Sequence, residues 1–357
     1  MKHLKIYAVP MLAMGLLATA CSSDDHESNL PLTGNQIQYS VAAPIAPRVV
    51  SRPETTTASI ETFLVNAFSE GTRFINNVTV NKNGGKWTPA EVSYWPAAPV
   101  NFYAISPDIR TNVTNNNGSM TFVYDNPGNQ DLLYSVAADQ TQSSTTAPKP
   151  VELNFRHALS RIVVLMSSAK SDMEVFVKEV ELENILQRGE FTYPSETTAI
   201  GGSLVGTWGI QTENGDADVF ESKKPDGTPN PDGQLLTSTA TEFSNCGFSF
   251  AIPQDLKVAG DVNNEVTGSY IKVEAVIKNK AGLVIWPNAQ TPAANRDGDK
   301  GIIRFPLCRD NAAMPWIAGQ AYIYNIAINN LPGLELIDFT VTVDQINYDK
   351  NVIDIEQ

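Results

Sequence analysis

The residues best able to do chemistry are scarce in this sequence of 357 residues. Its three histidines and three cysteines are His3, His26, His157, Cys21, Cys246 and Cys308. Such small numbers exclude a zinc cluster and leave His157 as the one histidine on which catalysis could rest. The nucleophile-elbow, phosphate-loop and zinc-protease patterns are absent as well. We therefore predict no catalytic residue, no metal site and no cofactor.

His157 stands in the strand-like segment Asn154–Leu159. A single histidine in a strand is more often packed or hydrogen-bonded than catalytic, because a catalytic imidazole needs a carboxylate that orients it. The sequence does not show such a partner. The loop Asn295–Asp299 offers oxygen ligands for calcium, but it lacks the EF-hand pattern that ends in a bidentate glutamate, so an ordinary turn is favoured.

The N-terminus has the pattern of an export signal. Lys2 and Lys5 precede the apolar run Ile6–Ala20, which is shorter than the roughly 20 residues of a membrane-spanning helix. The run ends in small residues and is followed at once by Cys21, as in a bacterial lipoprotein signal. We predict cleavage between Ala20 and Cys21 and lipidation of Cys21. The alternative is an ordinary signal peptide with a chance cysteine.

Residues 22–28 form an acidic, serine-rich tether. Such a stretch directly after a lipidated cysteine resembles the surface-export signal of Bacteroidetes lipoproteins, although a plain solvated spacer has a similar composition. The export route is oxidising, so Cys246 and Cys308 could pair as a disulfide there or remain two buried thiols.

The overall composition excludes two broad classes. The net charge of −14 argues against nucleic acid as a partner, because nucleic-acid-binding surfaces are basic. A hydrophobic content of 42% with only 18% charged residues argues against a disordered chain.

Short segments of alternating polar and apolar residues recur along the body of the chain. Glutamates alternate with apolar residues over 179–183, and lysine and glutamate alternate with apolar residues over 271–278. Similar segments lie at 248–252, 322–328 and 339–343, and turn signals such as Asn126-Pro127-Gly128 separate the segments. No long helical stripe is present. The pattern predicts an all-β fold of β-sandwich type.

The domain organisation follows from length and from a polar break. A β-sandwich of this kind takes roughly 100 residues or more, so the chain has room for two. We predict a signal peptide over 1–20, a tether with an N-terminal strand over 21–48, and sandwiches over 49–169 and 170–357. The Ser/Thr/Pro-rich stretch Gln140–Pro150 is the rival boundary.

One strand stands apart near the N-terminus. Ile37, Tyr39 and Val41 alternate with polar residues, which predicts a strand with one apolar face. A small, proline-containing linker follows and ends in Arg48, a basic residue in an accessible stretch. Arg52 is a poorer target for a trypsin-like protease, because Pro53 follows it. The alternative interpretation is a permanent first strand.

These segments resemble a known family. The resemblance covers most of the mature chain and rests on Val92–Pro96, Val100–Pro107, Gln130–Tyr134, Val151–Ile162, Phe250–Gln254, Gly319–Tyr324 and Ile337–Val343. Their order and spacing after a lipoprotein signal are similar to those of the Bacteroidetes fimbrillins, the subunits of type V pili.

The resemblance implies an assembly protein with two tandem transthyretin-like β-sandwich domains. It implies that an Arg-specific protease cleaves at Arg48 and removes the strand that carries Ile37, Tyr39 and Val41. A strand from another fimbrial subunit then fills the vacated groove, and the stretch from Leu334 is the candidate donor. The implied location is the cell surface, with attachment to the outer membrane through the lipid on Cys21.

Two other function classes stay open from the residues alone. One is a surface lipoprotein that does not polymerise and binds a glycan or a host protein. The other is an enzyme with paired carboxylates on its strands, which the lack of catalytic motifs disfavours.

Overall fold

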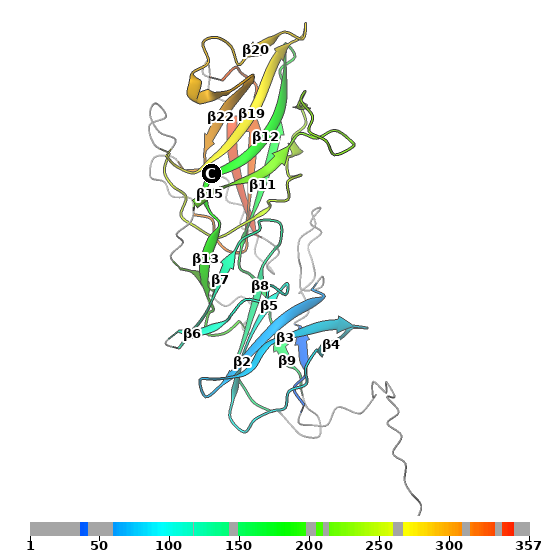
Figure 1. Cartoon of the computed structure of the whole chain (residues 1–357), viewed down its shortest axis with the longest axis vertical. Helices are drawn as coiled ribbons and strands as arrows, with labels where there is room; N and C mark the ends of the chain where they lie inside the picture. The colour runs from blue at the N-terminus through cyan, green and yellow to red at the C-terminus, as the bar shows by residue number, and fades with distance from the viewer. Residues whose placement is uncertain are drawn as a thin grey trace, which may run out of the picture. The chain divides into compact units, whose positions relative to one another are not determined.

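The computed structural model describes residues 36–41, 60–116, 118–142, 149–197, 205–209, 214–259, 267–308, 315–332 and 338–345. Apart from the short 3-10 turn η2 (Ala293–Asn295), these residues form strands and loops (Figure 1). None of the described segments is a helix of the length and apolarity that a membrane span requires. The prediction of an all-β fold is confirmed.

The first two sheets come mostly from the first half of the chain. The eight-stranded sheet has the order β10 (Arg156–His157), β8 (Leu133–Gln140), β5 (Val100–Ser106), β2 (Thr62–Ser69), β3 (Thr72–Asn83), β4 (Lys86–Pro89), β1 (Tyr39–Val41), β9 (Val151–Leu153). The four-stranded sheet has the order β14 (Thr207–Trp208), β13 (Arg188–Thr192), β7 (Ser119–Asp125), β6 (Thr114–Asn116).

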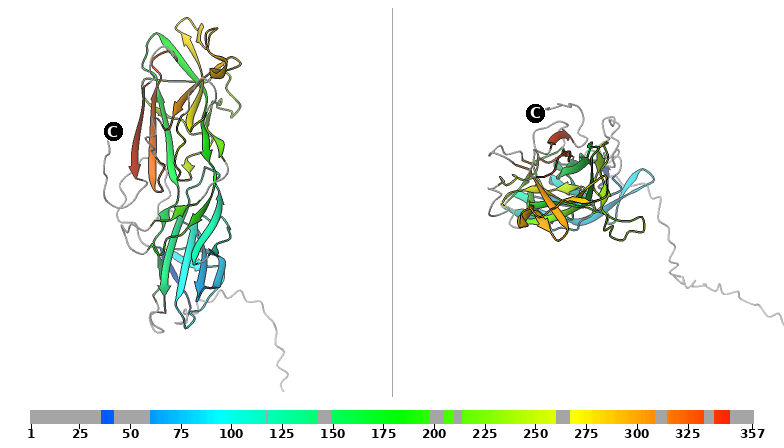
Figure 2. Two further views of the ribbon diagram at one scale, coloured as in Figure 1. Left: turned by 90° about the vertical axis from the view of Figure 1, so that its left-hand side faces the viewer. Right: turned by 90° about the horizontal axis from the view of Figure 1, so that it is seen from above.

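The other two sheets come mostly from the second half. The five-stranded sheet has the order β17 (Thr241–Glu242), β11 (Ser160–Ser167), β23 (Gln320–Ala327), β24 (Asp338–Gln345), with β18 (Phe250–Ala251) also on β11. The seven-stranded sheet has the order β15 (Asn214–Glu221), β12 (Met173–Leu186), β19 (Tyr270–Asn279), β22 (Lys300–Pro306), β21 (Arg296–Asp297). Here β16 (Gln234–Leu235) pairs with β12, and β20 (Val284–Trp286) pairs with β19. Figure 2 shows β23 and β24 side by side, in orange to red.

Alternation along the strands places one face of each sheet in a core. One core joins the five- and seven-stranded sheets through residues such as Val164, Val175 and Val273. Another joins the eight- and four-stranded sheets through Ile105 and Phe191, among others. A third is formed by residues of the eight-stranded sheet itself, such as Phe63 of β2, Phe102 of β5 and Leu153 of β9. Packed sheets of this kind are β-sandwiches, as the alternation predicted.

Strand pairing crosses the boundary that the sequence analysis set between residues 169 and 170. β11 precedes it but pairs in parallel with β23. Arg161 is opposite Ala321 at one end of this pairing, and Ser167 is opposite Ala327 at the other. β13 follows it but pairs antiparallel with β7, with Arg188 opposite Asp125 and Thr192 opposite Thr121. The division into two domains at this residue stays a prediction.

The turn at residues 126–128 is hydrogen-bonded to the chain where β18 begins. The Asn126 side chain donates to the carbonyl of Phe250 at 2.9 Å, and the amides of Ser249 and Phe250 both donate to the carbonyl of Gly128. Gly128 has φ +76°, and a Cβ there would lie 2.0 Å from the Phe248 ring. Glycine is therefore required at this position both by conformation and by space.

The outer face of the seven-stranded sheet has a ladder of ion pairs. Lys272 Nζ lies 2.6 Å from Glu181 and 3.1 Å from Glu274, and Arg304 binds Glu183 at 2.8 Å. Glu179 stands at the end of this ladder, and burial together with the charges of Glu181 and Glu274 raises its pKa to about 7. These glutamates are the outward-facing residues that the alternation over 179–183 predicted.

The raised pKa of Glu179 predicts a pH-dependent stability. Between its ordinary pKa of 4.5 and about 7, the unfolded chain releases the proton while the folded chain keeps it, so the free energy of unfolding falls as pH rises. We expect Glu179→Gln to raise the melting temperature by about 1–3 °C at pH 8, because solvent screens this partly exposed group, and to leave it unchanged at pH 4.5.

Glu174→Gln is the matched control, because Glu174 forms an ordinary ion pair with Lys280 at 3.3 Å. We expect no gain in stability from it at either pH. A lower melting temperature for Glu179→Gln at pH 8, measured by calorimetry, would show that Glu179 stabilises the ladder as an anion.

Candidate functional site: the N-terminal strand and its groove

β1 lies between β4 and β9 and hydrogen-bonds to both sides. Tyr39 is opposite Trp87 of β4 in antiparallel register and opposite Val151 of β9 in parallel register. The amide of Ile37 donates to the carbonyl of Ser93 at 2.9 Å, and the amide of Val151 donates to the carbonyl of Gln38 at 2.7 Å. The segment predicted from alternation is therefore a strand inside a sheet.

The apolar side chains of β1, together with Ile37 just before it, fill the core beneath the strand. Ile37 is 1% exposed and Tyr39 is 6% exposed, while Val41 is half-buried at the edge of the same core. The Tyr39 ring meets the rings of Phe63 and Phe102 edge-on, with centroids 6.2 and 6.1 Å apart. Edge-to-face pairs of this kind add to the free energy of burial, so Tyr39 is the anchor of the strand.

Burial also acts on the ionisation of this anchor. Removal from water raises the pKa of the Tyr39 phenol far above its ordinary value of 10.0. An ordinary tyrosine is already neutral at physiological pH, so burial reinforces the neutral face that the strand presents to its groove.

β9 has no hydrogen-bonded neighbour other than β1 among the described strands of its sheet. Without β1, the sheet would have a gap with unpaired backbone on both sides and an apolar floor that contains Phe63 and Phe102. A strand that refilled this gap in the same way would have to run antiparallel to β4 and parallel to β9. We call this space the β1 groove.

Other predicted site residues lie outside the part of the chain that the structure describes. These are Ala20, Cys21 and Arg48, and their roles stay predictions. The candidate donor, the stretch from Leu334, is described from Asp338 on. It forms β24, which is the last strand of the five-stranded sheet and pairs antiparallel with β23.

Comparison with known proteins identifies the family. The fimbrillin-like family model matches residues 48–345, from the predicted cleavage site to the end of β24. The chain belongs to the fimbrillin-like family. It is thus a fimbrial-type subunit of a cell-surface appendage. No curated protein matches its sequence.

Several solved structures are similar to this chain at low identity. A fimbrial protein from Bacteroides vulgatus is 14% identical, with 87% of this chain and 99% of that chain covered and a TM-score of 0.47. The tip fimbrial protein Mfa3 from Porphyromonas gingivalis, truncated at its C-terminus, is 11% identical, with 80% and 94% covered and a TM-score of 0.35. These likenesses are distant.

The fimbrillin-like fold does supply a carboxylate for His157. Asp131 Oδ2 lies 2.6 Å from His157 Nδ1, and both side chains are more than nine-tenths buried. The partner is 26 residues away in sequence, which is why sequence reasoning missed it. A substrate in solvent would not reach this imidazole, so the pair fits a buried link between β10 and the start of β8.

Two further predictions concerned cysteine and metal chemistry. Cys246 and Cys308 do not form a disulfide in this structure, and Cys308 is buried. Among the described residues, one group of three carboxylates lies close together, formed by Glu179, Glu181 and Asp218. Glu181 in this group already pairs with Lys272, and the group is part of the ladder on the seven-stranded sheet. The loop 295–299 is exposed and is not part of this group.

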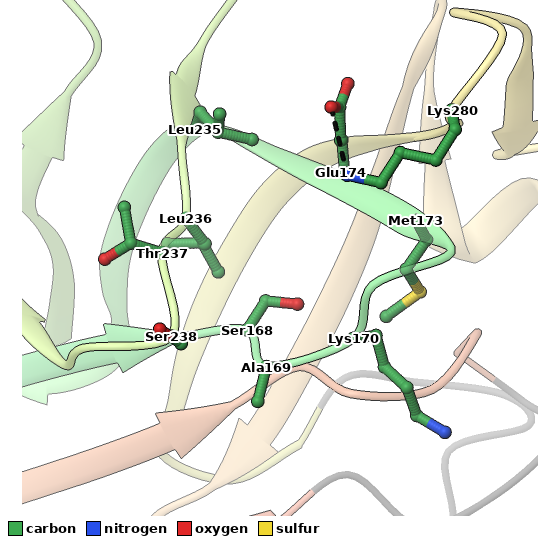
Figure 3. Close-up of a pocket in the computed structure, with 10 residues that line it drawn as sticks. All are labelled: Ser168, Ala169, Lys170, Met173, Glu174, Leu235, Leu236, Thr237, Ser238 and Lys280. Atoms are coloured by element: carbon green, nitrogen blue, oxygen red, sulfur yellow. Dashed lines mark hydrogen bonds and ion pairs between the residues drawn. The ribbon is translucent and has the colours of Figure 1, made fainter.

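A small pocket lies where β11 ends and β12 begins (Figure 3). Its volume is about 230 Å³, below the roughly 300–1,000 Å³ of most ligand sites. Ser168 points into it, and its buried hydroxyl has no hydrogen-bond partner among the described residues. Lys170 and Lys280 are exposed at its rim, and Lys280 is paired with Glu174. The β1 groove is therefore the better candidate for function.

The anchoring role of Tyr39 predicts a specific loss of stability. Tyr39→Ala should lower the free energy of unfolding by about 3–5 kcal/mol, because it leaves a cavity between Phe63 and Phe102. Tyr39→Phe keeps the ring and should change it by less than about 1 kcal/mol. Urea denaturation followed by tryptophan fluorescence measures both. Equal stability of Tyr39→Ala and the unsubstituted chain would show that the strand does not hold the core.

Proposed function

We propose that this chain is a structural subunit of a surface fimbria that is exported as a lipoprotein and assembled by strand exchange. The observation that carries the proposal is that β1 completes both the sheet and the core, yet it is separated from β2 by residues 42–61. One cut in that stretch leaves β1 held by non-covalent contacts alone. The match to the family model begins at residue 48 and leaves β1 out.

The energy of β1 binding suits an exchangeable strand. Full burial of a large apolar side chain contributes roughly 1.5–3 kcal/mol, so Ile37 and Tyr39 together give only a few kcal/mol beyond the backbone pairing. While β1 is tethered, this is enough to keep it in place. After cleavage the released strand is diluted, and a strand of equal apolarity at high local concentration replaces it.

Strand exchange then produces a filament as long as successive head-to-tail contacts do not close into a ring. The groove and the donated strand are different surfaces of the subunit, so each contact is head-to-tail and leaves a free groove and a free donor at the two ends. Backbone hydrogen bonds supply affinity, and alternate side chains set the register. We infer no enzymatic role for the chain.

The proposed lipid anchor predicts the behaviour of a Cys21 variant. Cys21→Ala removes the acceptor thiol, so the protein should appear as unprocessed precursor or in the soluble fraction. Two or three acyl chains on Cys21 would give stable anchoring, whereas one is marginal. The measurement is detergent partitioning with metabolic labelling by palmitate. Undiminished labelling of the variant would assign the lipid to another residue.

Cleavage at Arg48 predicts a change of size on exposure to an Arg-specific protease. The unsubstituted chain should lose its N-terminal segment and form ladders on unheated gels. Arg48→Ala should stay uncleaved and monomeric, with Arg52→Ala as the matched control that still assembles. A double variant that assembles as well as the unsubstituted chain would exclude strand exchange through this segment. A cleaved chain that stays monomeric would favour the alternative of a non-polymerising surface lipoprotein that binds a glycan or a host protein.

A further inference from the structure

Backbone pairing fixes the walls of the small pocket between β11 and β12. One wall is the connection from β11 to β12, and the other is the segment that follows β16. The amide of Ser168 donates to the carbonyl of Thr237 at 2.8 Å, and the amide of Leu236 donates to the carbonyl of Val175 at 2.9 Å. Lys280, in the turn after β19, closes a third side. The pocket is therefore formed by the fold itself.

Ser168 supplies the feature that points to a ligand. The residue is 8% exposed, and its hydroxyl oxygen has no hydrogen-bond partner among the described residues. A buried hydroxyl without a partner costs free energy, which a ligand that accepts its hydrogen bond recovers. Figure 3 shows the hydroxyl pointing toward the end of the Met173 side chain. Met173 is unbranched and has three rotatable bonds, so it can move aside and admit an acceptor atom.

The charge of the pocket lining is opposite to that of the whole chain. The chain has a net charge of −14, whereas the lining holds Lys170, Lys280 and one carboxylate, Glu174. Glu174 lies 3.3 Å from Lys280, and Lys170 forms no ion pair with another described residue. One positive charge is thus available, while Glu174 would repel a second negative charge on a ligand. A carboxylate, with its single charge, fits this lining.

Apolar and hydroxyl-bearing side chains complete the lining. Leu235 is 46% exposed at the pocket, and Thr237 and Ser238 follow it on the same wall. An exposed leucine beside hydroxyl groups suits a ring that has both a C–H face and hydroxyl substituents, as a sugar ring does. The volume of about 230 Å³ is smaller than the sites of drug-sized ligands, so the occupant is no larger than a single substituted ring.

We propose that this pocket binds one acidic sugar residue, whose carboxylate accepts hydrogen bonds from the Ser168 hydroxyl and the Lys170 ammonium group. The C–H face of the ring lies against Leu235, and Glu174 accepts hydrogen bonds from the ring hydroxyls. Two sources share this chemistry, namely sialic acids and the uronic acids of polysaccharides. None of the lining residues belongs to the eight-stranded sheet, so the proposal does not depend on strand exchange.

A single pocket of this kind binds weakly. Lys170 is exposed, and solvent screens the attraction between exposed charges. We expect a Kd of about 1 mM. If the subunits form the proposed fimbria, the pocket recurs once in every copy, and many weak contacts made together hold the filament to a surface rich in acidic sugars.

Saturation-transfer NMR on the purified full chain tests the class of ligand. The probes are N-acetylneuraminic acid, glucuronic acid, glucose and acetate. We expect at least one acidic sugar to bind with a Kd of about 1 mM, and glucose and acetate to bind at least about tenfold more weakly. Preference for N-acetylneuraminic acid assigns the ligand to sialylated glycans, and preference for glucuronic acid assigns it to polysaccharides.

Three results with these probes would overturn the proposal. If neither acidic sugar binds, the pocket is not a sugar site. If glucose binds as tightly as the acids, the carboxylate is not recognised. If acetate binds as tightly as the acids, the pocket holds an anion and makes no use of a ring.

Ser168→Ala tests whether the buried hydroxyl meets the ligand. Because the hydroxyl has no partner in the described part of the chain, its removal should leave the melting temperature unchanged or raise it. The same variant should weaken binding of the acidic sugar by about tenfold, since a hydrogen bond to a charged group is lost. A lower melting temperature would mean that the hydroxyl is bonded within the protein. That result, or unchanged binding, contradicts the proposed role of Ser168.

Lys170→Ala tests the charge at the pocket. It should weaken binding by about threefold, and the loss should shrink at high salt, because the pair is exposed. Lys224→Ala is the matched control, since Lys224 is an exposed lysine that does not line the pocket. It should leave binding unchanged. Equal losses for the two variants would reduce the interaction to non-specific attraction and would overturn the site.

Discussion

The pairing of β1 with both β4 and β9 is the interaction on which the eight-stranded sheet depends. Backbone amides and carbonyls need partners, and β9 finds them in this sheet only through β1 among the described strands. The same three-residue strand carries the anchor ring of Tyr39 into the core. Sheet continuity and core packing at this end therefore depend on one short segment.

Much of the fold follows from local patterns in the sequence. Alternation over 179–183 and 271–278 predicts which side chains face solvent, and the structure puts Glu181 and Lys272 together on that face. The same reasoning finds β1, because Ile37, Tyr39 and Val41 share a face whatever strand they pair with. Period-two patterns are local, so they are visible in one sequence without any knowledge of partners.

The partners themselves could not be predicted in this way. β11 pairs with β23 across a separation of 160 residues, from Arg161 to Ala321, and nothing near either strand specifies that choice. Asp131 and His157 come together because β8 and β10 are neighbours in the sheet, not because of their spacing. Whether Cys246 and Cys308 form a disulfide likewise depends on where distant strands place the two sulfur atoms. Register and sheet membership are determined by long-range packing, which a single sequence does not encode in short motifs.

The connection between β12 and β13 has a mechanical consequence. A single residue, Gln187, separates these strands, although β12 belongs to the seven-stranded sheet and β13 to the four-stranded one. The backbone is extended on both sides of this residue, so it has almost no slack to give when the chain is pulled. Tension applied across these two sheets acts at once on the hydrogen bonds of β12 to β19 and of β13 to β7, instead of first straightening a loop. A subunit built in this way would transmit a pull between its sheets with little stretching of its own.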